Sequence, residues 1–405
     1  MGNLARFFGG GDVAVGAKTT FYERTPHVHI DGTKVYVRTG TVLSDQNLID
    51  TTFWRFGRLN LSTSSVLPTL YGNVLGIATP CQIPSTGRIV IPVQSASGGP
   101  KGTVVSDDGG VGWSFFLNNI GTIITNGSLN VGFWHPGFNR VIYLASQNDH
   151  TWIFGHSTDG VAWTIASSSV ADGTHGWPDW YAASPNNFAV LRKSRSDTGT
   201  HSRFAIEKAN NLTNTSPTRV TVDVNTSSNW WPYGIVWDGT NYVVMARFSG
   251  GTAFRLLYAN DSTFSFTLGA VVDTSGLSLP RTFSFHLLPG GGSFRNIVPY
   301  SDAAGNRGFY YSNNSGATMT DFPLGANKTY FLSYAGFFDN KHWTNGEEGR
   351  FYTTTDFVNY VEVDHSMPTV LTSQRVFVGN TIGGFLAGTP SATSSGSFVD
   401  YVRAK

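Results

Sequence analysis

The apolar residues of this chain fall in short runs that are separated by clusters of glycine, asparagine, serine and threonine. Six of these runs each follow a Gly or Asn turn and have the length of a strand rather than of a helix. They are Gly87–Val93, Asn139–Ala145, Asn187–Lys193, Asn241–Arg247, Ser293–Pro299 and Gln374–Gly379. Because no long segment has the apolar period of an amphipathic helix, the pattern predicts an all-β protein.

A second motif recurs with a similar spacing. The segment VSDDGGVGW (Val105–Trp113) has the pattern Ser-x-Asp-x-Gly-x-x-Trp, and HSTDGVAW repeats it 51 residues later in a form that is one residue shorter. The pattern residues are Ser106, Asp108, Gly110 and Trp113 in the first copy, and Ser157, Asp159, Gly160 and Trp163 in the second. Weaker versions are Tyr258–Phe266, Tyr311–Met319 and Tyr352–Tyr360, while Phe204–Asn214 keeps the spacing but few of the residues. Two independent features that share a period near 50 residues indicate an internal structural repeat.

Each repeat can be divided into an inner strand, a turn, the apolar strand, a third strand, the motif and a fourth strand. Such a meander cannot bury both of its faces alone, whereas radial packing of several meanders covers the faces and protects the edges. We place the units at 71–124, 128–170, 174–226, 229–275, 281–325 and 328–366. A last sheet is expected to combine strands from Pro368–Arg403 with a strand from Thr52–Val66. The result is a seven-bladed β-propeller with four-stranded antiparallel blades, although six or eight blades also fit the spacing.

The region ahead of the ring has two parts. His27–Gly40 alternates like a β-hairpin, with an Asp-Gly turn at Asp31–Gly32. Residues 1–25 belong to neither hairpin nor blade, so we interpret them as an extended N-terminal docking arm and residues 26–405 as the propeller domain. The arm residues expected to contact a partner are Leu4, Phe7, Phe8, Gly9, Gly10 and Gly11.

The two strong copies of the motif resemble the Asp-box of sialidase-like β-propellers. In that family the box lies between the third and fourth strands of a blade, away from the ligand face. Asp and Ser can hydrogen-bond the backbone of a turn, Gly can take a positive φ, and Trp can fill the space beneath a neighbouring blade. The resemblance therefore implies an architectural role for Asp108 and Asp159 rather than a catalytic one.

Composition excludes several classes of partner. The formal net charge is +1 and the basic residues are scattered, so we expect no nucleic-acid partner. Cys81 is the only cysteine and is expected to be a buried small residue.

Met1–Ala17 lacks the apolar core of a secretory signal and no stretch is long enough to span a bilayer, which predicts synthesis in the cytoplasm without membrane insertion. His27 and His29 have no further ligand at metal spacing, so we expect neither a metal nor another cofactor.

Aromatic clusters suggest a site for glycans. GFWHPG, HGWPDWY and NWWPYG precede the apolar strands of three successive units, in connections that would open on the face around the central channel. Ring faces stack on the C–H surfaces of sugars, while nearby polar groups orient the hydroxyls. The alternative is that these rings pack between blades. The candidate glycan-binding residues are Trp134, His135, Trp177, Asp179, Trp180, Tyr181, Trp230, Trp231 and Tyr233.

A sialidase-like glycoside hydrolase acting on surface polysaccharide is the enzymatic alternative. The resemblance to sialidases implies three arginines that hold a carboxylate, a Tyr nucleophile with a nearby Glu, and an acid/base Asp, while glycosidases in general need a pair of carboxyl groups. The five glutamates do not precede an obvious inner strand, and the Phe-Arg-Ile-Pro start of sialidases is absent. We therefore favour a binding protein and assign no catalytic residues.

The arm and the composition resemble those of bacteriophage virion proteins. Tail fibres and tail-associated proteins join a short N-terminal segment, which docks on the particle, to a β-rich body that faces the host. This resemblance implies localisation in the virion, other virion proteins as partners through the arm, a host-surface glycan as a further partner, and a symmetric multi-copy assembly. A cellular propeller scaffold is the remaining possibility.

Overall fold

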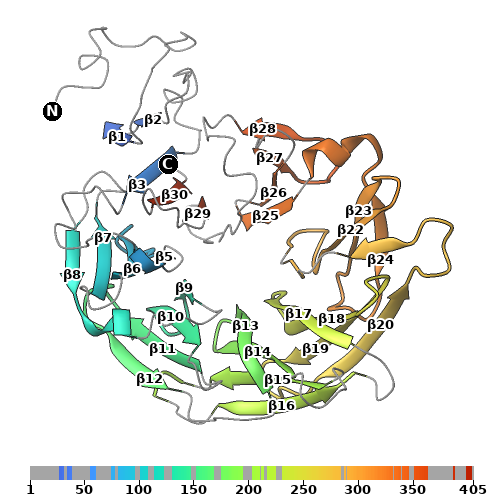
Figure 1. Ribbon diagram of the computed structural model, residues 1–405, viewed down its shortest axis with the longest axis horizontal. Helices are drawn as coiled ribbons and strands as arrows, with labels where there is room; N and C mark the ends of the chain where they lie inside the picture. The colour runs from blue at the N-terminus through green and yellow to red at the C-terminus, as the bar shows by residue number, and fades with distance from the viewer. Residues whose placement is uncertain are drawn as a thin grey trace, which may run out of the picture.

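The computed structural model shows sheets arranged radially in a ring (Figure 1). It describes residues 27–31, 34–38, 55–60, 74–77, 81–95, 101–107, 114–122, 130–146, 152–167, 175–194, 203–209, 211–213, 217–224, 230–283, 287–288, 290–331, 333–338, 340–345, 351–363, 386–387 and 398–403. We number the blades 1 to 7 in the order in which the sheets follow one another around the ring. Within a blade, the first strand lies nearest the centre and the fourth lies at the rim.

Blades 2 to 6 are four-stranded antiparallel meanders. Their strands are, in blade order, β9 (Asn130–His135), β10 (Arg140–Ser146), β11 (Trp152–Ser157) and β12 (Thr164–Ser167); β13 (His175–Ala183), β14 (Phe188–Ser194), β15 (Arg203–Ala209) and β16 (Thr218–Asp223); β17 (Trp230–Trp237), β18 (Asn241–Phe248), β19 (Ala253–Asn260) and β20 (Thr267–Asp273); β21 (Arg281–Phe283), β22 (Val298–Asp302), β23 (Arg307–Tyr311) and β24 (Thr320–Pro323); β25 (Ser333–Phe338), β26 (Lys341–Asn345), β27 (Phe351–Thr354) and β28 (Val361–Val363).

Blade 1 has an inner strand in two pieces. It contains β4 (Val74–Ile77), β5 (Cys81–Gln82), β6 (Ile89–Ser95), β7 (Lys101–Ser106) and β8 (Ser114–Leu117). Both β4 and β5 pair with β6, β4 along Val93–Ser95 and β5 along Ile89–Val90, so the two short strands share one edge.

Blade 7 combines the two ends of the chain. It contains β29 (Leu386–Ala387) and β30 (Phe398–Arg403), and β30 pairs along its other edge with β3 (Arg55–Asn60). A hairpin of β1 (His27–Asp31) and β2 (Lys34–Arg38) precedes β3. The ring is thus closed by hydrogen bonds between strands that lie more than 300 residues apart in the sequence.

Burial explains why the second strands are continuous apolar runs. In β18 every residue from Tyr242 to Ala246 is fully buried, because neighbouring blades cover both faces of the sheet. The rim strand β20 of the same blade is mostly exposed. Two short 3-10 helices, Asn119–Thr122 and Gly325–Tyr330, are the only helical segments among the described residues.

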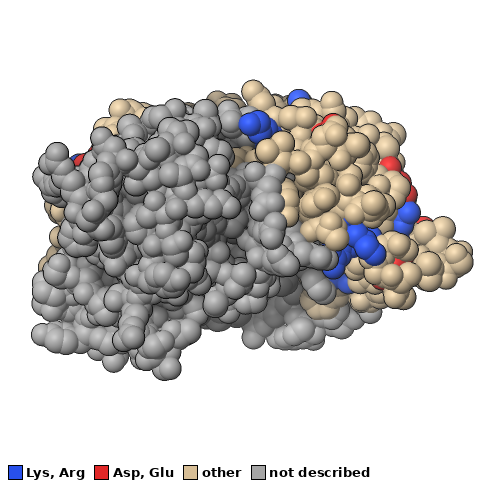
Figure 2. Space-filling view, turned by 90° about the horizontal axis from the view of Figure 1, so that it is seen from above, with Lys and Arg blue, Asp and Glu red and all other residues tan. Residues whose placement is uncertain are grey.

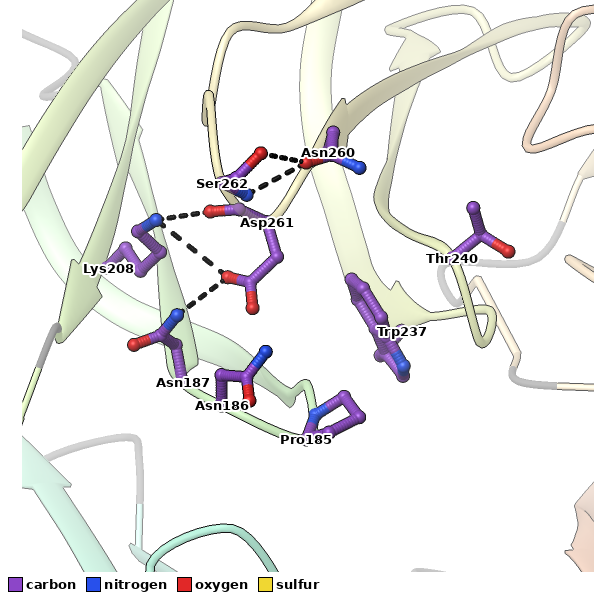
Figure 3. A pocket seen from close by; sticks show the side chains of 9 residues that line it. All are labelled: Pro185, Asn186, Asn187, Lys208, Trp237, Thr240, Asn260, Asp261 and Ser262. Atoms are coloured by element: carbon purple, nitrogen blue, oxygen red, sulfur yellow. Dashed lines mark hydrogen bonds and ion pairs between the residues drawn. The ribbon is translucent and has the colours of Figure 1, made fainter.

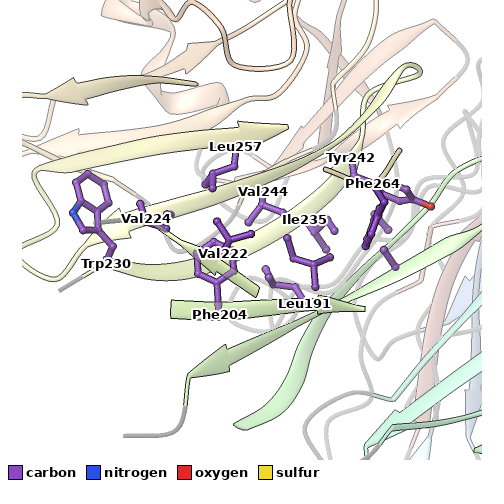
Figure 4. Close-up of a cluster of buried hydrophobic side chains, with 14 of the residues drawn as sticks. Leu191, Phe204, Val222, Val224, Trp230, Ile235, Tyr242, Val244, Leu257 and Phe264 are labelled. Carbon is purple, nitrogen blue, oxygen red and sulfur yellow. The ribbon is translucent and has the colours of Figure 1, made fainter. Parts of the chain in front are cut away.

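The core consists of apolar layers between blades. Figure 4 shows the layer between blades 3 and 4, where side chains of β14, β15 and β16 meet those of β17, β18 and β19. The labelled residues are Leu191, Phe204, Val222 and Val224 on blade 3, and Trp230, Ile235, Tyr242, Val244, Leu257 and Phe264 on blade 4 and its loops. Burial of each such side chain contributes roughly 1.5–3 kcal/mol, so each blade depends on its neighbours for stability.

The predicted fold is confirmed. The sheets of blades 1 to 6 fall within the six sequence ranges that the repeats defined, and β3 lies within the segment expected to join the last sheet. The arm residues Leu4, Phe7, Phe8, Gly9, Gly10 and Gly11 lie outside the described residues. Charged side chains are sparse on the described part of the face in Figure 2, and among the described residues no helix is long and apolar enough to span a membrane.

Candidate functional site

In an antiparallel meander the first-to-second connection and the third-to-fourth loop lie at the same end of the sheet, and for blades 1 to 6 we call this end the box face. The shorter Asp-box lies here in blade 2. Its Ser157 hydroxyl accepts the Gly160 N–H at 2.8 Å, and Asp159 Oδ1 accepts the N–H groups of Val161 and Ala162 at 2.8 and 3.0 Å. These backbone bonds lower the pKa of Asp159, against the effect of its partial burial.

The Trp of this box reaches the preceding blade. Trp163 Nε1 donates to the Gly160 carbonyl at 3.0 Å and to Thr103 Oγ1 of blade 1 at 3.1 Å. Its ring is 8% exposed and packs in the apolar layer that contains Val90 and Ile120. The geometry is that of a link between blades.

The longer box of blade 1 is described only in part. Ser106 is buried, while Asp108, Gly110 and Trp113 lie outside the described residues. The neighbouring Asp107 binds Arg88 at 2.5 Å, and Arg88 also donates to the Asp159 carbonyl at 2.8 Å, which joins the box loops of blades 1 and 2.

Two weaker copies keep the same hydrogen bonds with different residues. In blade 6, Thr354 Oγ1 accepts the Phe357 N–H and Asp356 Oδ1 accepts the N–H groups of Val358 and Asn359. Phe357 takes the glycine position at φ 57°. In blade 5, Asn314 replaces the aspartate and accepts the Thr318 N–H at 2.9 Å.

The blade 4 copy has a different geometry. Asp261 points across to blade 3, where it accepts the Ser184 hydroxyl at 2.8 Å and the Asn187 side-chain amide at 2.9 Å. The Lys208 ammonium, 5% exposed, donates to the Asp261 carbonyl and lies 3.8 Å from its Oδ1. We call this Ser–Asp–Asn set the first clasp.

The interface between blades 4 and 5 contains a second Ser–Asp–Asn set, which we call the second clasp, and in it the turn and the box loop have exchanged the Ser and the Asp. Here the turn of blade 4 supplies the acid: Asp238 Oδ2 accepts the hydroxyl of Ser315, from the box loop of blade 5, at 2.6 Å. Asn241 donates to Ser315 Oγ at 2.9 Å, as Asn187 donates to Asp261 in the first clasp.

A pocket of about 460 Å³ opens on the box face beside the first clasp (Figure 3). Its lining residues are Pro185, Asn186, Asn187, Lys208, Trp237, Thr240, Asn260, Asp261 and Ser262. The Trp237 ring stands across the opening from Lys208 and Asp261. Trp237 is held edge-on against Tyr242, with 5.1 Å between ring centroids, so its orientation is set by the core of blade 4.

The rim of the pocket is polar and exposed. Asn186, Thr240, Asn260 and Ser262 are all exposed, and Asn260 Oδ1 is already held by the Ser262 backbone N–H at 2.8 Å. The pocket therefore combines one aromatic wall, several amides and hydroxyls, and one internally paired Lys–Asp set. Such a lining can orient a small polyhydroxylated ligand.

None of the residues predicted to bind glycans lines this pocket, and their role in glycan binding stays a prediction. Trp134 and His135 end β9, Trp177 to Tyr181 lie inside β13, and Trp230 to Tyr233 begin β17, so they occupy strands rather than equivalent connections. The side chains of Trp177 and Asp179 lie outside the described set.

The described members of that group pack between blades. Trp230 is 7% exposed, Tyr181 stacks on Phe133 with centroids 4.7 Å apart, and Trp180 meets Tyr233 edge-on at 6.1 Å. Trp134 packs against the layer between blades 1 and 2, and Trp231 is partly buried in β17. An inner strand faces both neighbouring blades, which explains why large rings are placed there.

His135 connects this packing to the pocket. It is fully buried, its Nε2 donates to the Asn187 carbonyl at 2.9 Å, and its Nδ1 accepts the Phe138 N–H at 3.2 Å. Burial lowers the pKa of His135, so the neutral ring is favoured.

Glu207 is the glutamate that the structure describes most fully, and it is not placed for catalysis. Its side chain has no exposure and lies 3.0 Å from the equally buried Arg192; Arg219 and the Trp152 indole of blade 2 also bind it. Such a buried, fully paired carboxylate joins blades 2 and 3. Within the described ranges, no group of three His, Cys, Asp or Glu side chains could hold a metal ion.

No protein-family model and no curated protein matches the sequence. Similar solved structures include a prolyl endopeptidase (TM-score 0.48, 11% identity, 80% of this chain and 46% of that chain). Others are Porphyromonas gingivalis dipeptidyl peptidase 4 (0.48, 10%, 96% and 58%) and Trypanosoma rangeli sialidase (0.40, 11%, 72% and 56%). The chain spans about half the length of each of these proteins. The assignment as a β-propeller rests on the sheet order and the closed ring.

Proposed function

We propose that this β-propeller is a carbohydrate-binding protein and that the pocket beside the first clasp is its binding site. The observation that carries the proposal is the placement of the Trp237 ring opposite the amides and hydroxyls of Asn186, Asn260 and Ser262. A sugar presents a C–H face and a hydroxyl edge, which such a pair of walls fits.

Binding is favoured over hydrolysis at this pocket by its carboxyl groups. Asp261 is the one carboxylate in the lining, and both of its oxygens accept hydrogen bonds from blade 3. Most glycosidases use two carboxyl groups on either side of the scissile bond, whereas sialidases use a tyrosine nucleophile. The sialidase-like alternative is tested by incubating the protein with surface polysaccharide, since the release of reducing sugar would contradict a purely binding role.

The binding test is Trp237→Ala on an immobilised glycan panel. We expect a loss of affinity of at least about fivefold, because stacking of a ligand ring on one aromatic side chain, as measured for nucleic-acid bases, contributes roughly 1–3 kcal/mol. Tyr330→Ala is the matched control, since Tyr330 is an aromatic residue 36% exposed at the end of the 3-10 helix Gly325–Tyr330, outside the pocket. Unchanged binding by Trp237→Ala, or binding of no glycan by the wild type, would contradict the proposal. The inner-strand surface around Trp177 and Trp231 is tested on the same panel with Ala substitutions.

We also propose a setting for this activity, namely a bacteriophage virion in which residues 1–25 dock the protein on other virion proteins. The support comes from the sequence: low charge, and three successive glycines between apolar residues in the arm. Repeated copies in a symmetric particle would turn weak glycan binding at each pocket into strong attachment to the host surface. Deletion of residues 1–25 is expected to leave a folded propeller that no longer enters particles, so normal incorporation of the deletion protein would refute this role of the arm.

A further inference from the structure

We infer that the pocket selects neutral glycans and disfavours acidic ones such as sialylated or uronate-containing chains. This inference rests on the proposed function and concerns the ligand class of the same pocket. It is carried by the internal pairing of the charged side chains that line the pocket.

The two ionic side chains of the lining neutralise each other. Lys208 is 5% exposed and Asp261 is 8% exposed, and the ammonium donates to the Asp261 backbone and faces its carboxylate at 3.8 Å. The Lys208 ammonium also lies 4.9 Å above the Phe264 ring. A ligand carboxylate could reach this ammonium only by approaching the Asp261 carboxylate, and like charges repel strongly where water is partly excluded.

The next charged groups around the pocket are paired as well. Asp238, adjacent to the lining, accepts the hydroxyl of Ser315 and the amide of Asn296, and its carbonyl accepts Arg295 at 3.4 Å. The remaining lining groups are amides, hydroxyls, a proline and an indole, none of which is charged. Proteins bind carboxylates most effectively with the planar guanidinium of an arginine. The one cation in the pocket lining is Lys208, which is already paired with Asp261.

Two side chains of blade 3, Asn187 and Ser184, hold the Asp261 carboxylate in position. The Asn187 amide donates to Asp261 Oδ1 at 2.9 Å and the Ser184 hydroxyl donates to Oδ2 at 2.8 Å, so the carboxylate is held beside Lys208 rather than turned into the solvent. A neutral sugar can bind without disturbing this set, using Trp237 and the exposed rim.

The experiment measures binding to two matched probe pairs: lactose with 3′-sialyllactose, which adds one acidic residue, and the methyl ester of trigalacturonate with trigalacturonate, which keeps the sugars and linkages but carries the free carboxylates. The wild type is expected to bind at least one neutral probe more tightly than its acidic partner. The variant Asp261→Asn removes one negative charge, keeps the side-chain shape and takes away the carboxylate partner of Lys208, whose ammonium keeps its hydrogen bond to the backbone carbonyl of residue 261. It is expected to shift the ratio of acidic to neutral affinity by at least about fivefold toward the acidic probes.

Asp302→Asn is the matched control, because it removes a carboxylate at the end of β22 that is not part of the pocket lining. It should leave the affinity ratio unchanged. Since Asp261→Asn could unfold the interface, the salt dependence of the wild type provides a second measurement. Neutral binding is expected to change by less than about twofold between roughly 50 and 500 mM NaCl, because no net ligand charge is involved.

The outcomes separate the two proposals. Tighter binding of the acidic probes by the wild type, lost in Trp237→Ala, would overturn the inference and leave carbohydrate binding intact. Steep weakening of binding with salt would also overturn the inference. Binding to none of the four probes or to the wider glycan panel would overturn the proposed function itself.

Discussion

A single glycine determines how closely the box of blade 2 approaches blade 1. Gly160 has φ +74°, and a Cβ at this position would lie 2.4 Å from Val90 Cγ2. The backbone conformation and the contact both require glycine. The box residues are therefore set by packing between blades, whereas Asn186, Thr240 and Ser262 at the pocket rim are exposed and free of that constraint.

Gly160→Ala is expected to lower the free energy of unfolding by about 2–4 kcal/mol, from backbone strain and the clash with Val90 together. The measurement is urea denaturation. Gly305→Ala is the matched control, because Gly305 has φ +76° but a Cβ added there would meet no atom within 4 Å. Equal losses in the two variants would show that the contact with Val90 contributes nothing.

His342 predicts a dependence of stability on pH. Its ring lies 4.5 Å from that of Phe357 and 4.7 Å from that of Phe337, and burial lowers its pKa to about 4 from 6.5. Since the folded state favours the neutral ring, this contribution to stability is complete above pH 6.5 and is lost as the pH falls toward 4. As the pH falls from 6.5 toward 4, the wild type should therefore lose unfolding free energy relative to His342→Phe. A pH-independent difference would contradict the assignment.

At the scale of elements, the two clasps hydrogen-bond the first-to-second turn of one blade to the box loop of the next blade. The exchange of Ser and Asp between Ser184–Asp261 and Asp238–Ser315 shows that the hydrogen bond matters more than which element supplies the acid. Ser184 and Asp238 also accept the same backbone N–H groups of their turns, from Asn187 and Asn241.

The double variant Asp238→Ser/Ser315→Asp tests this interchangeability. Each single substitution is expected to cost about 1–3 kcal/mol, the first by loss of a charged acceptor and the second by placing two carboxylates together. The double variant should recover at least about 1 kcal/mol, because it restores a Ser–Asp pair. Ser315 has φ 58°, a conformation that Asp tolerates. Additive losses in a double-mutant cycle would disprove the coupling.

At the scale of the whole molecule, stability depends on closure between distant strands. β3 provides an edge of blade 7 that β30 cannot cover alone. A chain that begins at Arg55 should keep the closed ring, whereas one that begins at Leu61 should lose it. We expect the second to unfold at a temperature at least about 5 °C lower than the first, as measured by calorimetry. Equal midpoints would mean that the pairing of β3 and β30 is dispensable.

The fold could be predicted from the sequence because the same local features recur. The Gly or Asn turn before each apolar strand and the box after the third strand mark the blade even where the box residues have changed, as in Thr354–Tyr360. These features depend on short-range hydrogen bonds that a few residue types provide.

The candidate site could not be predicted in the same way. Its residues come from two turns, the strand β15 and an altered box, and Asn187 and Asp261 are 74 positions apart. Trp237 stands just before the turn that precedes Asn241–Arg247, and in the sequence this turn served only as a marker of the repeat. The aromatic clusters lie in inner strands rather than in connections, and composition does not reveal whether a ring there faces solvent or the gap between two blades.

The strand register of blade 7 allows a circular permutation of the chain. Arg55 and Arg403 are direct partners on adjacent antiparallel strands, so a two-residue Asn-Gly connection could join them as an ordinary hairpin. New ends could then be opened at the exposed Ser275–Gly276, between blades 4 and 5. Such a circular permutant would have every sheet formed from contiguous chain, and its seam would move to a junction between two complete blades, which backbone hydrogen bonds such as Ala270 N–H to the Gly316 carbonyl at 3.1 Å also join.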